Sequence, residues 1–232
     1  MNGKKLRLLK KVLAEFIGTY MLVFVGCGSI IVDTLHPGSL GHLGISFSFG
    51  LTVMVMIYAT GHISGAHFNP AVTLAFALNR SFPKGEVLFY WTGQIIGAVT
   101  AAICLESLFG NIGDLGATLP HREVQTVLGL EIGLTFFLMF VITAVATDHR
   151  VEGSAAGLAI GSTVAAAALF GGPISGASMN PARSLGPALV SGNWEGLWLY
   201  LLAPCIGAVT AAFVYNFISC STDEPESAAG CC

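Results

Sequence analysis

Two asparagines that stand in the same nine-residue pattern are the side chains best placed to do chemistry. The pattern Ile-Ser-Gly-Ala-x-x-Asn-Pro-Ala occurs once with Asn69 and again with Asn180. Asparagine is a favoured N-cap and proline a favoured first helical residue, so each copy predicts a helix start. When the side-chain oxygen caps its helix, the amide NH₂ remains a hydrogen-bond donor. If the two helix starts meet, these donors face one small space between two positive helix ends.

An arginine follows the second pattern but not the first. Arg183 lies three residues after Asn180, where the first copy has Val72. A cation in the first turn of a helix opposes the helix dipole, and a charge inside a membrane is costly. The side chain either reaches the outer headgroups or lines a constriction. We favour the constriction, in which Arg183 would be a donor and a positive barrier near the outer mouth.

The composition places both patterns in a membrane. The chain has 232 residues, of which 54% are hydrophobic and 10% charged, whereas soluble domains carry roughly 25% charged residues. A helix that crosses a bilayer needs about 20 apolar residues. Six stretches approach or exceed this length: residues 12–32, 44–60, 87–109, 127–147, 155–170 and 197–219. The stretches 69–79 and 180–190 are too short to cross and predict half-helices.

The two halves of the chain repeat one another. The segment from Ala14 resembles that from Leu130, and the segment from Gly93 resembles that from Ala203. Each half holds three spans, so the halves enter the membrane in opposite senses, as in many transport proteins. The sequence predicts an all-α membrane protein with six transmembrane helices and two re-entrant half-helices in an inverted repeat. We expect a basic N-terminus at 1–11, repeats at 12–109 and 126–219, an extracellular connecting loop at 110–125 and a disordered cytoplasmic tail at 220–232.

The basic residues predict the orientation. Five of the ten lysines and arginines lie in the first eleven residues, and Arg80, Lys84 and Arg150 fall in later connections on the same side. Cytoplasmic loops are enriched in lysine and arginine. We therefore expect a multi-pass protein of the cell (plasma) membrane with both termini in the cytoplasm.

These features together resemble the aquaporin, or major intrinsic protein, family. The resemblance covers residues 12–219 and rests on the six spans, on Arg183 and on two motifs, Asn69-Pro70-Ala71 and Asn180-Pro181-Ala182. The stretch "GGPISGASMNPARSLGPALV" is similar to the nodulin-like branch of that family. The resemblance implies a passive channel for water and small uncharged solutes such as glycerol. It also implies exclusion of protons and ions, and a homotetramer with one pore in each subunit.

A selectivity filter of four residues is a further implication of the resemblance. Counted back from the two motifs, its members are Phe49, Ala168 and Ala177, and Arg183 completes the set. Strictly water-selective relatives typically have histidine at the Ala168 position, so we expect a wider filter here. Ser184 and Ala188, however, match water channels rather than efficient glycerol channels. A strictly water-selective channel therefore remains an alternative.

Two acids and two histidines in or beside the apolar stretches need an explanation. Glu15 and Glu131 stand at matching positions of the two repeats. They either accept hydrogen bonds from the loops of their repeats, which we favour, or carry protons in a secondary transporter. His62 and His67 flank the first motif and are expected to anchor its loop or line the pore. The sequence has no pattern typical of a metal cluster, a nucleophile–base pair or a phosphate loop, so we expect no enzyme, no cofactor and no nucleic-acid partner.

Overall fold

The computed structural model describes residues 3–147 and 155–219, and the regular secondary structure of these residues is entirely helical. Six of its helices are long and apolar enough to cross a membrane. The predicted fold class is thereby confirmed. The helices are α1 (Gly3–Leu35), α2 (Gly41–Ser64), α3 (Pro70–Leu78), α4 (Val87–Phe109), α5 (Val124–Thr147), α6 (Ala156–Ser175), α7 (Pro181–Ser191) and α8 (Leu197–Ile218), with short 3₁₀ turns η1 (Lys84–Glu86) and η2 (Gly113–Gly116). The predicted tail at 220–232 and Arg150 lie outside the described residues.

Several helices extend beyond the predicted apolar stretches. The first, α1, begins at Gly3, because the lysines, leucines and arginine of residues 3–11 are good helix formers even where they are not apolar. The ends of α2 and α6 come at matching glycines. Gly65 and Gly176 adopt left-handed φ angles of 89° and 79°, and their N–H groups donate to Gly61 O and Gly172 O. Glycine tolerates this conformation, so it stops each helix just before the re-entrant loop.

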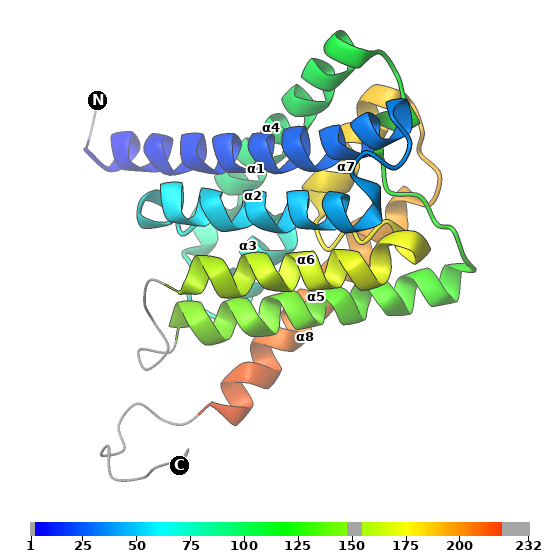
Figure 1. The fold of residues 1–232 in the computed structure, drawn as a ribbon. Coiled ribbons are helices and arrows are strands. Elements are labelled where there is room, and N and C mark those ends of the chain that lie inside the picture. The colour runs from blue at the N-terminus through cyan, green and yellow to red at the C-terminus, as the bar shows by residue number, and fades with distance from the viewer. Residues whose placement is uncertain (1–2, 148–154, 220–232) are drawn as a thin grey trace.

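The arrangement of the helices brings the two repeats into contact. In Figure 1, α1, α2, α6 and α5 run side by side, and α4 and α8 cross them. Within the repeats α1 packs against α2 and α4, and α5 packs against α6 and α8. The half-helices pack across the repeats, α3 against α8 and α7 against α4. Residues at the tips of the half-helices therefore lie between the two halves of the chain.

Glycines allow the closest helix contacts. A Cβ atom added to Gly97 would lie 2.5 Å from Phe16 O, and one added to Gly93 would lie 2.8 Å from Val12 O. Small residues let the backbones of membrane helices approach in this way. In contrast, a Cβ atom at Gly129 would have no atom within 4 Å. Of these glycines, only the α4 pair is required by packing inside the chain.

We expect the Gly97→Ala variant to be less stable than the wild-type protein. The added methyl group would press on the α1 backbone, and overpacking of this kind costs about 1–3 kcal/mol. Thermal unfolding of the purified protein in detergent measures the effect as a lower midpoint. Gly129→Ala is the matched control and should leave the midpoint unchanged or higher. A Gly97→Ala midpoint equal to that of the control would contradict the contact.

Candidate functional site: a cavity between the two half-helices

Asn69 and Asn180 cap the two half-helices. Asn69 Oδ1 accepts from Ala71 N at 2.9 Å, and Asn180 Oδ1 accepts from Ala182 N at 3.0 Å. Each asparagine has an extended backbone and is followed by proline at the first helical position. Local chemistry therefore sets both helix starts.

The same two side chains also join the repeats. Asn69 Nδ2 donates to Met179 O at 2.7 Å, and Asn180 Nδ2 donates to Phe68 O at 2.8 Å. From the sequence we expected both N–H groups of each asparagine amide to face the space between the helix starts. This expectation is corrected, because one N–H of each amide donates to a carbonyl of the opposite loop. A second N–H remains on each asparagine, because an amide NH₂ carries two donors.

A cavity of about 150 Å³ lies at this junction. Both asparagines line it, together with residues of both re-entrant loops. All four residues of the expected filter, which come from α2, α6, the second loop and α7, line the same cavity: Phe49, Ala168, Ala177 and Arg183. Most of the remaining wall is aliphatic, from Leu22, Val53, Ile57, Val72, Leu138, Ile142, Ile160 and Val164.

Arg183 is held inside the protein. The residue is 2% exposed, and its Nη1 donates to Gly116 O at 2.7 Å. The guanidinium carbon lies 4.9 Å from the centroid of the Phe49 ring, a cation–π distance. Among the described residues Nε finds no hydrogen-bond partner. The buried side chain is bound inside the protein, so it does not reach the headgroups, and its role in a constriction stays a prediction.

The two histidines differ in position. His67 lines the cavity, and its Nδ1 lies 3.0 Å from Thr73 Oγ1. Its ring packs against Phe82 with centroids 5.0 Å apart. His62 is exposed near the end of α2 and is not among the residues that line the cavity. The expectation that His62 could line the pore is therefore corrected, because its side chain is exposed and only His67 of the two lines the cavity.

Glu15 holds the first re-entrant loop. Its Oε1 accepts from Ser64 Oγ at 2.7 Å and from His67 N at 3.0 Å. Its Oε2 accepts from Phe68 N at 2.7 Å and from Gln94 Nε2 at 2.8 Å. Four donors on one buried carboxylate satisfy its charge.

Glu131 holds the second loop in the same way. Its Oε1 accepts from Ser175 Oγ at 2.6 Å and from Ser178 N at 2.8 Å, and its Oε2 accepts from Met179 N at 2.9 Å. Both acids are fully buried and absent from the cavity lining. Their contacts match the structural alternative, not the proton-carrying one.

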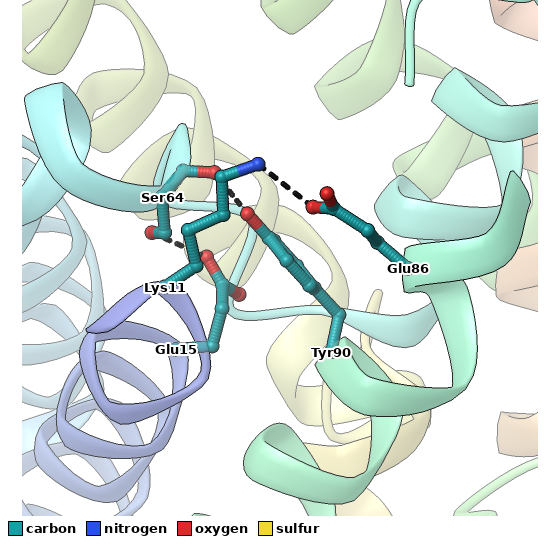
Figure 2. A network of polar contacts seen from close by, with 5 residues as sticks. All are labelled: Lys11, Glu15, Ser64, Glu86 and Tyr90. Atoms are coloured by element: carbon teal, nitrogen blue, oxygen red, sulfur yellow. Dashed lines mark hydrogen bonds and ion pairs between the residues drawn. The ribbon is translucent and has the colours of Figure 1, made fainter. Parts of the chain in front are cut away.

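Figure 2 shows Glu15 and Ser64 together with further polar contacts between α1, α2, η1 and α4. Tyr90 OH donates to Ser64 O at 2.6 Å, so the end of α2 is tied to α4. Nearby, Lys11 Nζ lies 2.7 Å from Glu86 Oε2 and joins α1 to η1 (Figure 2). Together with the bond from Ser64 to Glu15, these bonds connect α1, the end of α2, η1 and α4 beside the first loop.

The re-entrant loops have strained backbones at matching positions. Ala66 and Phe68 have φ angles of 51°, and their counterparts Ala177 and Met179 have φ angles of 43° and 53°. Residues other than glycine rarely adopt positive φ, and such strain clusters at functional sites. The carboxylates bind the N–H groups of Phe68 and Met179, and the asparagines bind their carbonyls, so long-range bonds hold the strain in place.

We expect Glu15→Gln to destabilise the protein strongly. Each carboxylate oxygen of Glu15 accepts two hydrogen bonds. Glutamine replaces one of these oxygens by an NH₂ group, which cannot accept, so two of the four donors lose their acceptor. A buried donor left without a partner costs about 1–3 kcal/mol, so the thermal midpoint in detergent should fall clearly. Glu106→Gln, on the exposed side of α4, is the matched control. Equal midpoints for the two variants would mean that Glu15 does not anchor the loop.

Three residues of the site were not identified from the sequence. Gln94 reaches Glu15 from α4, and a lone glutamine in an apolar span was a signal that could have identified it. Gly116 accepts from Arg183, and Thr118 donates to Ser184 beside it. Both lie in the connecting segment, where the sequence shows no periodic pattern.

Comparison with known proteins identifies the family of the chain. The family model described as "Major intrinsic protein" matches residues 2–215. The chain belongs to the major intrinsic protein family. This family, which includes the aquaporins, consists of multi-pass membrane channels and is not a class of enzymes.

Within the major intrinsic protein family, the chain is similar to nodulin-26 and to aquaporins named NIP. Nodulin-26 of Glycine max is 49% identical over 220 residues, which cover 94% of this chain and 81% of that protein. Aquaporin NIP1-1 of Oryza sativa subsp. japonica is 50% identical over 211 residues, which cover 90% and 74%. The X-ray structure of the aquaglyceroporin from Plasmodium falciparum has a TM-score of 0.83 at 23% identity and covers 91% of this chain and 96% of that one. This structural likeness supports the same fold.

Proposed function

We propose that the protein is a passive membrane channel for water and small uncharged solutes such as glycerol. The observation that carries this proposal is the cavity between the half-helix tips, with aliphatic walls and few polar groups, among them Asn69, Asn180 and Arg183. Relatives named aquaporins and a structural neighbour named an aquaglyceroporin support it. We propose no enzymatic activity, no resident metal or cofactor and no nucleic-acid partner.

The half-helix tips explain how ions would be excluded. The N-termini of α3 and α7 meet at the cavity, and each carries a partial positive charge. A neutral molecule with an oxygen atom can accept from the free N–H of each asparagine. A cation, including hydronium, meets two positive helix ends and an aliphatic wall that cannot replace its hydration shell. A water molecule that accepts from both asparagines points its hydrogens away from the centre, which interrupts a proton relay.

The filter explains the choice among neutral solutes. Phe49 and Arg183 form one side of it at a cation–π distance. Ala168 and Ala177 line the same cavity and have only a methyl group as side chain. Pore width and lining donors decide which solute passes, so two alanines favour solutes somewhat larger than water.

We further propose a plasma-membrane homotetramer with both termini in the cytoplasm. The cluster of basic residues in 1–11 supports this orientation. The start of α1 and the end of α8 lie toward the same end of the bundle in Figure 1, which agrees with an even number of crossings. The assembly as a tetramer, with one pore in each subunit, rests on the family alone.

Stopped-flow light scattering on proteoliposomes tests the function. Vesicles with the protein should shrink faster in an osmotic gradient than protein-free vesicles, with a low activation energy, and should re-swell quickly in glycerol. Fast water flow without glycerol entry would favour the strictly water-selective alternative. Saturation or a response to a proton gradient would favour a transporter. Permeabilities equal to those of bare lipid for both solutes would contradict the proposal.

A further inference from the structure

The connecting segment from η2 to His121 lies against α7, the second re-entrant loop and the end of α6. Gly116 O accepts from Arg183 Nη1 at 2.7 Å, and His121 N donates to Ile174 O at 3.2 Å. Between these contacts, a Cβ atom at Gly176 would lie 3.3 Å from the Thr118 backbone. The segment and the filter loop are thus in van der Waals contact where the filter is built.

Thr118 begins a chain of hydroxyl groups that runs into this loop. Thr118 Oγ1 donates to Ser184 Oγ at 2.7 Å, and Ser184 Oγ lies 2.5 Å from Ser178 Oγ. Ser178 Oγ donates to Asn180 O at 3.1 Å. A hydroxyl has one proton to donate, so Ser184 must donate to Ser178, and the chain has a single direction from Thr118 to Asn180. All three hydroxyl-bearing residues are at most 4% exposed.

A comparison of the two repeats explains why the hydrogen-bond donor to Ser184, Thr118, lies outside the second repeat. Thr73 is the counterpart of Ser184 and receives a hydrogen bond from Gln94 Nε2 at 3.0 Å, within the first repeat. The counterpart of Gln94 is Pro204, because the segment from Gly93 aligns with that from Ala203. Proline has no side-chain donor. In the second repeat, the connecting segment provides this donor through Thr118.

We propose that Thr118 is a positioning residue for Arg183 and thereby helps to determine which solute the channel admits. The Thr118 hydroxyl fixes Ser184, and Ser184 is the residue next to Arg183 in the first turn of α7. Gly116, two residues before Thr118, fixes the other end of the arginine side chain. The guanidinium group of Arg183 and the side chain of its neighbour Ser184 are therefore both bound to one short segment. This inference rests on the proposed function for its effect on transport, but not for the position of Arg183.

Permeability ratios test the effect on selection. Thr118→Val keeps the shape but removes the hydroxyl, so Arg183 should become less constrained and the ratio of glycerol to water permeability should rise at least threefold. Thr118→Ser keeps the hydroxyl and should retain the wild-type ratio. Thr92→Val is the matched control, because the exposed Thr92 hydroxyl donates only to Leu88 O within α4. A Thr118→Val ratio equal to that of the control, or equal changes for the valine and serine variants, would overturn the proposal.

Chemical modification of Arg183 tests the positioning without transport. Phenylglyoxal reacts with guanidinium groups, and mass spectrometry of peptides gives a rate for each arginine. Arg183 should react at least threefold faster in Thr118→Val than in the wild-type protein and in Thr118→Ser, while the exposed Arg122 should react equally in all three. Equal Arg183 rates would overturn the proposal even if the channel conducts. A faster rate in a protein that conducts neither solute would contradict the proposed function and leave the positioning role supported.

Discussion

Replacing Arg183 with valine is expected to raise glycerol permeability and to admit protons and small cations. The change removes a positive charge from the cavity, together with the bond to Gly116 O and the contact with Phe49. A fixed charge in a low-dielectric passage acts strongly on a passing ion. Each tenfold change in rate corresponds to only about 1.4 kcal/mol, so we expect cation and proton fluxes to rise at least tenfold.

Stopped-flow assays with an entrapped pH dye measure this effect beside water and glycerol flow. Arg122→Val is the matched control, since it removes the same charge from an exposed position in the connecting segment. Arg183→Lys separates charge from shape: it should exclude cations but relax solute selection, because lysine lacks the planar fork of donors. Unchanged selectivity in Arg183→Val would remove Arg183 from the filter.

The half-helix starts could be predicted because their chemistry is local. The capping bond from Ala71 N to Asn69 Oδ1 spans two residues, and so does the bond from Ala182 N to Asn180 Oδ1. The six spans follow from apolar length, and the opposite sense of the two halves follows from the odd number of spans in each. Contacts of this range leave a pattern in the sequence.

The strained loops could not be predicted, because their conformation depends on distant residues. Phe68 and Met179 have side chains that disfavour positive φ, and nothing in their types indicates it. Each is held by a carboxylate from the first span of its own repeat and an asparagine from the other repeat. The same long-range bonds use one N–H of each asparagine, which the sequence had left free.

The contacts of the connecting segment could not be predicted from the sequence either. The sequence predicted residues 110–125 only as a loop between the repeats. The structure brings Gly116 to Arg183 and Thr118 to Ser184, contacts that join residues 67 and 66 positions apart. Hydrogen bonds over such distances follow no periodicity. The filter residues, in contrast, had been placed by family resemblance, and all four line one cavity.

The double change Ala168→His with Ala177→Cys is expected to close the channel to glycerol while water still passes. Both alanines line the cavity, so a ring from α6 and a thiol from the second loop would extend into it. A ring added at position 168 would occupy part of this cavity of about 150 Å³. Pore width then becomes the limit for glycerol, which is larger than water. We expect glycerol permeability to fall at least tenfold, equivalent to about 1.4 kcal/mol of added barrier, and water permeability to stay within about threefold.

The single variants show which residue sets the width. Ala168→His alone should produce most of the effect, because the imidazole ring is far larger than the thiol and also offers a hydrogen-bonding nitrogen to water. Ala166→His adds the same ring to an exposed position of α6 and should leave both permeabilities unchanged. Ala177 already has a φ angle of 43°, so cysteine there adds little backbone strain beyond that of alanine. If glycerol flux survives the double change intact, Ala168 and Ala177 do not form the constriction, and the width must be set by Phe49 and Arg183 alone.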